Sequence, residues 1–530
     1  MKIALISPND KGSYRNANFL NENLGLGYLW AYLEERGHTI TLCDARFHNY
    51  TPNQAKALLE NEGFDVLGFS IWTGEGAEWC QDFLNIFLPM DNHNHKKIHV
   101  ILGGYFPTLQ PERSFKMLPQ TTAIVMGEGE IVFDELLNTL MSQQDFRNIK
   151  GIAYYDTQQN KVITTERAKI LEDLDTLPWP KRYLIDKMGE YDEVYMEGSR
   201  GCVFCCTFCA IRPFIGIGSG SPWRHRSARS VVEEIKHLKK QNPTLKTFRF
   251  IDSDFIGPSE HARALEFADL VKQEVPGIKF HIEGRAVSIS KSKNLLQKLK
   301  EAGLFRVYLG VESGSQKILN KMNKQTTVQE NIDALAVLNE VGVDCTYGFI
   351  MFTPWTTEED IDENVKFLKN VGNIQMNKFF TELLLIPNTA AYKMARRDFP
   401  IEIKDDDRTY YTYPSLSPEV GRVRKIAKIF EKKQTDFMNR LWFIHRGIRN
   451  AHRRNLPETK QYESASSNLF LKIFDFCWKQ AKETSIIEKN IVQHCMEHFH
   501  GEINQFLDHL KQKDLLKISS YTDEFQHNVS

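Results

Sequence analysis

The chain has 530 residues, 42% hydrophobic and 25% charged, with 67 lysines and arginines against 68 aspartates and glutamates. A chain of this length has more residues than one hydrophobic core can organise, so we expect about three domains. The formal net charge of −1 argues against a dedicated nucleic-acid binder, which normally has a basic surplus. The sequence contains no run of ~18 uncharged apolar residues, so it does not predict a membrane span. The N-terminus lacks the pattern of a signal peptide. We therefore expect a cytoplasmic protein with neither nucleic acid nor membrane as a partner.

Residues 1–145 alternate apolar runs with helical patterns. The runs lie at 2–7, 39–44, 65–71, 99–105 and 122–130. Buried strands separated by helices predict a parallel, Rossmann-like α/β domain, which binds ligands beyond the carboxyl ends of its strands. The candidate ligand-binding residues at those ends are Ser70, Thr73, Gly103, Gly104, Gly127, Glu128 and Gly129.

Residues 146–190 are predicted to be a connector with a small hairpin and a proline-interrupted segment. A second alternating series covers 191–400. Its candidate strands are 193–200, 247–254, 279–286, 306–314, 344–352 and 379–387. Six strand–helix units in about 200 residues favour a partial (β/α)6 barrel, with chemistry at the C-terminal strand ends. Residues 401–530 are predicted to be a helical substrate or accessory domain, and the basic stretch 445–455 is most simply a solvated helix face.

The segment 200–210, RGCVFCCTFCA, contains four of the nine cysteines, Cys202, Cys205, Cys206 and Cys209. A zinc site is disfavoured, because its two cysteine pairs are normally separated by ~12–20 residues. The spacing Cys202-x3-Cys206-x2-Cys209 instead suits three thiolates around an iron–sulfur cluster, with one iron open and Cys205 as a spare. Unliganded thiols are the remaining alternative.

The cysteine spacing, with Phe208 before its last cysteine, resembles that of the radical S-adenosylmethionine (SAM) enzymes. Further matches are an R-x-R-S segment at Arg224–Ser227 and a G-x-E-S-G segment at Gly310–Gly314. The resemblance implies that Cys202, Cys206 and Cys209 hold a catalytic [4Fe–4S] cluster whose open iron binds SAM. It implies further cofactor contacts at Phe208, Asp252, Glu283, Arg285, Glu312 and Ser313. For the charged residues among these, a salt bridge at the rim of the barrel is the alternative.

The N-terminal domain resembles the cobalamin-binding domain of one large branch of the same family. The matching segments are 23–38, 68–75, 102–112 and 127–136. This branch includes class B radical SAM methyltransferases and the anaerobic magnesium-protoporphyrin monomethyl ester cyclase. One departure is that Arg46 stands where many cobalamin proteins place a cobalt-ligating histidine after Asp44, and His48 is out of register. We expect His48 to be an exposed loop residue.

The resemblance implies a cobalamin-dependent radical SAM enzyme, most simply a C-methyltransferase that acts on an unactivated carbon. The alternative is an oxidative cyclase or rearrangement enzyme that binds cobalamin without methyl transfer. A tRNA methylthiotransferase is disfavoured, because residues 1–199 contain only Cys43 and Cys80. The intact cysteine triad disfavours a non-enzymatic cobalamin sensor. The implied partners are a small-molecule or peptide substrate and an external electron donor of flavodoxin or ferredoxin type.

Overall fold

The computed structural model describes most of the 530 residues. It leaves out 11–21, 89–96, 190–191, 217–219, 258–260, 373, 375, 400–412, 432–439, 442, 446, 449–455, 484–487 and 516–530. The contacts divide the chain into two compact units. Unit 1 comprises 1–283, 294–306 and 385–411, and unit 2 comprises 284–293, 307–384 and 412–530. Among the described helices, none is long and apolar enough to cross a membrane.

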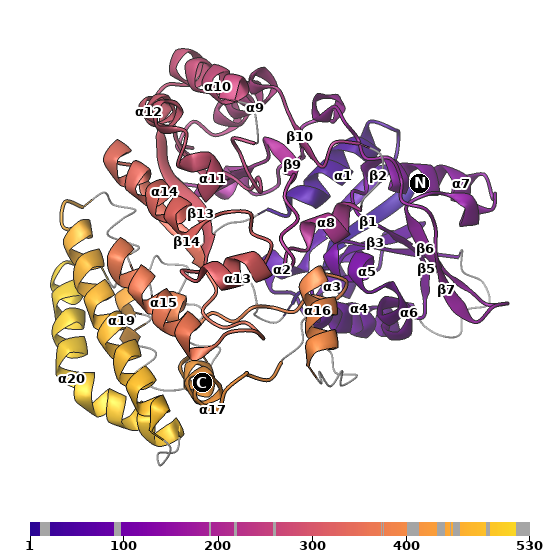
Figure 1. The fold of residues 1–530 in the computed structure, drawn as a ribbon. Helices are drawn as coiled ribbons and strands as arrows, with labels where there is room; N and C mark the ends of the chain where they lie inside the picture. Colours follow the sequence, from indigo (N-terminus) through magenta and orange to yellow (C-terminus); the bar gives the residue numbers. More distant parts are fainter. Residues whose placement is uncertain are drawn as a thin grey trace. The chain divides into compact units, whose positions relative to one another are not determined.

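Unit 1 begins with a seven-stranded sheet of order β2-β1-β3-β4-β5-β6-β7 (Figure 1). The first five strands pair in parallel, whereas β6 and β7 are antiparallel. The expected alternation of strands and helices is therefore confirmed, and the hairpin expected in the connector extends the same sheet. The strands are β1 (Lys2–Ser7), β2 (Thr39–Asp44), β3 (Val66–Ser70), β4 (His99–Gly103), β5 (Thr121–Val125), β6 (Ile152–Asp156) and β7 (Lys161–Thr164).

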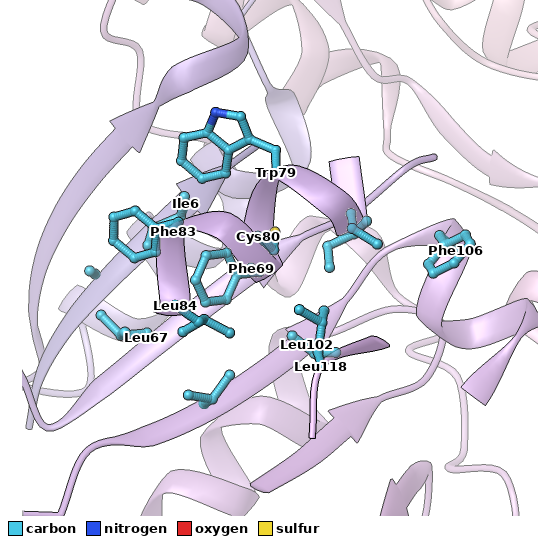
Figure 2. Close-up of a cluster of buried hydrophobic side chains, with 14 of the residues drawn as sticks. Ile6, Leu67, Phe69, Trp79, Cys80, Phe83, Leu84, Leu102, Phe106 and Leu118 are labelled. Atoms are coloured by element: carbon cyan, nitrogen blue, oxygen red, sulfur yellow. The ribbon is translucent and has the colours of Figure 1, made fainter. Parts of the chain in front are cut away.

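Each face of this sheet buries its own hydrophobic core against helices. One core joins the sheet to α3, α4, α5 and α6, and Figure 2 shows its central side chains, among them Trp79, Phe83 and Leu102. The other core joins the sheet to α1 and α7. The helices are α1 (Leu24–Glu34), α2 (Ala45–His48), α3 (Pro52–Leu59), α4 (Gly74–Phe87), α5 (Tyr105–Leu109), α6 (Pro111–Met117) and α7 (Glu130–Met141).

Unit 1 continues with the first half of the second α/β series, in which β11 pairs in parallel with both β8 and β12. The expected strand at 193–200 is wrong as a single element. It breaks into β8 and β9 at Gly198, because the Gly198 N–H and the Ser199 hydroxyl both bind the Asp252 carboxylate. Strand β9 then pairs antiparallel with β10. The elements are β8 (Glu193–Met196), β9 (Ser199–Gly201), α8 (Ile211–Ile215), β10 (Trp223–His225), α9 (Ala228–Gln241), β11 (Thr247–Phe250), α10 (His261–Glu274), β12 (Lys279–Arg285), α12 (Lys293–Ala302) and α16 (Ala390–Asp398).

Unit 2 contains the neighbouring strands β13 and β14 and a set of helices. The strand expected at 379–387 is wrong, since only the isolated bridge Phe352–Glu382 forms there. The Phe352 carbonyl accepts from both Leu383 N–H and the Tyr413 hydroxyl, which leaves no regular ladder to continue. The elements are α11 (Ala286–Ile289), β13 (Leu304–Glu312), α13 (Gln316–Lys321), α14 (Val328–Val341), β14 (Asp344–Phe349), α15 (Glu358–Val371), α17 (Pro418–Glu431), α19 (Thr459–Lys482) and α20 (Glu488–Gln512). The last three confirm the expected helical C-terminal region.

Candidate functional site

A cavity of about 340 Å³ opens at the carboxyl ends of the first sheet, within unit 1. Its apolar floor lies between the sheet and helices α1 and α7, with Leu5, Leu26 and Phe133 among the lining residues. Its opposite wall comes from the later part of the chain, including Arg200, Phe214 and Ile251. Residues separated by more than 150 positions thus enclose one space, which suits a flat, largely apolar group with polar edges.

Two glycines keep the rim of the cavity open. Gly104 has φ +94°, and a Cβ there would lie 2.6 Å from the Ile71 carbonyl oxygen. Gly127 has φ +83°, and a Cβ there would lie 2.9 Å from the Phe214 carbonyl oxygen. Only glycine adopts these conformations without strain and leaves this space.

Six of the seven ligand-binding candidates from the first domain come together around this cavity. They are Ser70, Gly103, Gly104, Gly127, Glu128 and Gly129. Thr73 does not belong to the lining. Its buried hydroxyl accepts a hydrogen bond from the Gly76 N–H at 3.1 Å and caps helix α4. A serine or threonine before a helix is ambiguous in the sequence, because capping and ligand binding favour the same residue type.

The segment after β2 does not reach the cavity either. The Asp44 carboxylate accepts from the Phe47 N–H and, at 2.7 Å, from the Tyr183 hydroxyl. His48 is exposed, as expected, and its ring stacks on Tyr50. Neither Arg46 nor His48 is among the residues that line the cavity.

A cluster of buried charges forms one side of the cavity. Arg200 binds Glu197 at 2.7 Å and Glu130 at 2.8 Å, and Arg224 binds Glu128 through two hydrogen bonds of 2.6 and 2.9 Å. Burial opposes ionisation of Glu128, but the Arg224 guanidinium and the charge of Arg200 hold its pKa below the usual value. These ion pairs therefore connect strand β9 with residues 128–130, which follow strand β5 of the first sheet.

The segment 202–209, here called the cysteine loop, follows directly after Arg200 and Gly201. Cys202 is buried, Cys206 and Cys209 are half-buried, and Cys205 is exposed. The Cys209 N–H donates to the Cys206 carbonyl at 3.1 Å, which closes a turn between these two cysteines. Phe208, between them in sequence, is half-buried. The Cys205 sulfur instead accepts from the Arg212 guanidinium at 3.3 Å.

The donor set of the cysteine loop consists of thiols, which are the usual ligands of an iron–sulfur cluster. In the described part of the chain, no group of three or more His, Cys, Asp or Glu side chains is arranged to hold one ion. A [4Fe–4S] cluster is ligated at separate irons, so its cysteines need not converge on one point. Three thiols on one loop at the edge of the cavity meet that requirement.

Aromatic side chains connect the cysteine loop with the first sheet. Tyr105 follows Gly104 and stacks on Phe214 of α8, with ring centroids 4.2 Å apart, while Trp72 lies 5.1 Å from Tyr105. Burial raises the pKa of Tyr105, and the nearby Cys209 thiol adds to this effect. We did not expect a role for Tyr105, although its position after two glycines at a strand end was an available signal.

The remaining candidates in unit 1 are engaged in structural contacts. Asp252 is buried and accepts from the Gly198 N–H at 3.0 Å and from the Ser199 hydroxyl at 2.6 Å. Glu283 pairs with Arg249 at 3.4 Å. Burial raises the pKa of both carboxyl groups. Asp252 thus positions the chain that leads into the cysteine loop.

In unit 2, Arg285 and Glu312 share Lys324 as a partner, and Ser313, the residue after Glu312, has a separate partner in Asn364. Glu312 has φ +67° and pairs with Lys324 at 2.9 Å, while Arg285 donates to the Lys324 carbonyl. The Ser313 hydroxyl is fully buried and donates to Asn364 at 2.8 Å. The sequence offered no local signal for Lys324 or Asn364, which lie 12 and 51 positions from their partners.

Two family models match the chain, the B12 binding domain over residues 14–137 and the Radical SAM superfamily over residues 196–368. The chain is 28% identical over 377 residues to an uncharacterized methyltransferase of Pyrococcus horikoshii, an alignment that covers 70% of this chain and 78% of the relative. It is 27% identical over 444 residues to an anaerobic magnesium-protoporphyrin IX monomethyl ester cyclase of Rubrivivax gelatinosus, with 81% and 76% covered.

Solved structures share the fold. The cobalamin-dependent SAM radical enzyme OxsB, with aqua-cobalamin and SAM bound, matches with a TM-score of 0.75 at 19% identity, covering 97% of this chain and 79% of that chain. The radical SAM methyltransferase TsrM from Kitasatospora setae, with tryptophan and a SAM analogue bound, matches with a TM-score of 0.59 at 16% identity, covering 75% and 76%.

Proposed function

We propose that this chain is a C-methyltransferase that acts on an unactivated carbon. It is an enzyme that joins a B12 binding domain to a radical SAM domain, and it therefore uses a [4Fe–4S] cluster, SAM and cobalamin. The observation that carries the proposal is the shared cavity. Strand ends of the B12 binding domain and residues next to the cysteine loop enclose it together. A methyl donor and a hydrogen-abstracting centre must face the same substrate, and a cavity bounded by both regions supports the proposal.

The residues present fit the cofactors as follows. Cys202, Cys206 and Cys209 would ligate the cluster, and Ser70, Gly103, Gly104, Gly127, Glu128 and Gly129 would contact cobalamin. When bound, these cofactors supply reductive cleavage of SAM and a transferable methyl group. The chain itself contributes position and exclusion of water. Arg200, Glu128 and Glu130 hold the two binding regions together, and Tyr105 and Phe214 close the space between them with stacked rings.

A second candidate is an oxidative cyclase or rearrangement enzyme. The specific observation in its favour is the cyclase relative from Rubrivivax gelatinosus, whose alignment covers 81% of this chain. Such an enzyme would use the same cavity and the same cysteines but transfer no methyl group. The two candidates therefore differ in their products rather than in their cofactor-binding residues.

The deciding experiment is anaerobic reconstitution with iron, sulfide and hydroxocobalamin, followed by incubation with SAM and dithionite. Formation of S-adenosylhomocysteine together with 5′-deoxyadenosine supports methyl transfer. Formation of 5′-deoxyadenosine alone by a cobalamin-loaded chain supports the cyclase or rearrangement. A chain that takes up no cobalamin contradicts both candidates.

We further propose a small molecule or a peptide as the substrate and the cytoplasm as the location. The three cysteines must stay reduced to ligate iron, which a reducing compartment ensures. The substrate-selecting residues are proposed to lie in the C-terminal region 401–530 and at the mouth of the barrel. The proposed substrate contacts in the C-terminal region are Tyr410, Tyr411 and Tyr413, with the basic stretch 445–455. Tyr413 is buried and donates its hydroxyl to the Phe352 carbonyl, so it stabilises the fold. Tyr410, Tyr411 and most of the basic stretch 445–455 lie outside the described residues.

A further inference from the structure

The cysteine loop has an outer side as well as a side next to the cavity. Ile211 and Phe214, which follow the loop, line the cavity. Cys205 is exposed, and its sulfur accepts from Arg212, which is itself only half-buried. An electron carrier in solution could therefore approach the loop from the side of Cys205 without entering the cavity.

Helix α16 lies against this loop. The Ala391 N–H donates to the Thr207 carbonyl at 2.7 Å, between Cys206 and Cys209 in sequence. The neighbouring Asn388 donates to the Leu109 carbonyl, so the same segment also contacts the B12 binding domain. Both contacts lie within unit 1. The N-terminal turn of α16 is thus fixed next to the cysteine loop.

The exposed side of α16 is basic. Ala391 and Ala395 are buried four residues apart, whereas Lys393, Arg396 and Arg397 are exposed at i, i+3 and i+4 and share one helix face. We call these three residues the basic face. At 1.5 Å per residue, it runs from about 3 Å to about 9 Å along the helix from the Ala391 contact. The basic face therefore begins immediately beside the loop.

Intramolecular ion pairs account for only part of this charge. Arg397 pairs with Asp398 at 2.8 Å. Among the residues that the structure describes, Lys393 and Arg396 have no ion-pair partner, and Arg396 only approaches the Tyr392 ring. Cations near a helix C-terminus also stabilise the helix dipole, but that effect is confined to the last turn, and Lys393 lies in the first. The whole chain has a net charge of −1, so this positive surface is local.

We propose that the basic face of α16, together with Arg212, docks a small acidic one-electron donor protein of the flavodoxin or ferredoxin type. Opposite charges steer such weak, short-lived complexes and increase their rate of formation, and redox encounters need only a small interface. Docking serves a single electron transfer, in which the donor is oxidised by one electron and the cluster is reduced by one, with no covalent bond changed. The inference rests on the proposed function only in requiring a reducible cluster.

The test compares protein and chemical reductants on the reconstituted full chain. The variant Lys393→Glu/Arg396→Glu/Arg397→Glu reverses the basic face. The matched control, Lys240→Glu/Lys246→Glu/Lys279→Glu, reverses three exposed lysines near the N-terminal ends of β11 and β12, away from the loop. The rate of 5′-deoxyadenosine formation from SAM is measured with flavodoxin kept reduced by NADPH and a flavodoxin reductase and, separately, with dithionite.

We expect the basic-face variant to lose about tenfold or more of its rate with flavodoxin at low salt, and to keep its rate with dithionite. The control should match wild type with both reductants. Raising KCl from about 0.05 to about 0.5 M should slow wild type, because salt screens the attraction, and should not slow the variant, whose repulsion of the donor is screened instead. A milder variant with glutamine at the three positions should be intermediate.

Equal losses with both reductants, no loss with flavodoxin, or the same loss in the control would overturn the docking surface. So would a wild-type chain that dithionite reduces but flavodoxin does not. Failure of the proposed function gives a different result, since wild type and variant alike would then form 5′-deoxyadenosine without S-adenosylhomocysteine, or no 5′-deoxyadenosine at all, with dithionite.

Discussion

Cys205 differs from the other three cysteines of its loop in exposure and in its contact with Arg212. We expect Cys202→Ala, Cys206→Ala and Cys209→Ala each to abolish the cluster, because each removes one thiolate ligand. Cys205→Ala is the matched control and should retain most of the iron. Iron and sulfide analysis with the visible absorbance of anaerobically reconstituted protein measures both. Loss of the cluster in the Cys205 variant would mean that the ligand assignment is wrong.

Adjacent glycines at the cavity rim differ in how much room they have. A Cβ at Gly104 would meet the Ile71 carbonyl at 2.6 Å, in a residue with φ +94°, whereas one at Gly103 has ordinary contacts of 3.7 Å and more. We expect Gly104→Ala to lower the free energy of unfolding by about 1–3 kcal/mol through backbone strain. Gly103→Ala should cost much less. Urea unfolding of the two variants measures the difference, and equal losses would contradict the strain.

At the scale of single elements, a helix cap explains why one predicted ligand-binding residue lies outside the cavity lining. Thr73 caps α4 and lies outside the cavity lining. We expect Thr73→Ala to lower the free energy of unfolding by about 1 kcal/mol and to leave cobalamin uptake unchanged. Denaturant unfolding and the absorbance of bound cobalamin measure the two effects. Reduced cobalamin uptake at unchanged stability would restore Thr73 to the binding site.

The buried arginines allow a matched comparison between two kinds of ion pair. Arg200 pairs with Glu130 and Glu197 beside the cavity, and Arg182 pairs with Glu22 and Glu234 away from it. Replacing Arg200 by methionine removes the ion-pair partner of Glu130 and Glu197, and replacing Arg182 removes that of Glu22, whereas Glu234 keeps its pair with Arg226. Removing one partner of a buried ion pair costs about 3–5 kcal/mol. We expect both variants to unfold more easily, but only Arg200→Met to lose cobalamin per folded chain. Equal cobalamin content in the two would contradict a role of Arg200 in holding the cavity wall.

Local patterns predicted most elements, whereas long-range contacts decided the exceptions. The strands and helices of the first sheet follow apolar periodicity and were predictable, as was the gathering of six residues at the strand ends. The break at Gly198 depends on Asp252, 54 positions away, and the missing sixth strand depends on the Tyr413 hydroxyl. Arg200 stands two positions before Cys202, but its partners Glu128 and Glu130 come from the first α/β domain. No local pattern encodes such a pairing.

For the molecule as a whole, His281 makes stability depend on pH. It is 4% exposed, and burial, with the charges of Arg249 and Arg306, lowers its pKa to about 2. The unfolded chain takes up this proton below pH ~6.5, while the folded chain does not, so stability falls as pH falls from ~6.5. The contribution approaches 1.4 kcal/mol per pH unit below that point. We expect His281→Phe to flatten the slope of unfolding free energy between pH 6.5 and 5, measured by urea unfolding; an unchanged slope would contradict the assignment.

The shared cavity also has a consequence for how the protein is made. Its first wall ends at Phe133, and the last residue of its second wall is Ser253. A ribosome adding about 5–20 residues per second reaches the second wall on the order of 10 s after the first. During that interval the cavity of the nascent chain is incomplete, and its apolar floor is exposed to solvent. Capture of cobalamin at the proposed site therefore follows synthesis of both walls, when the chain is nearly half complete and the second domain is still being made.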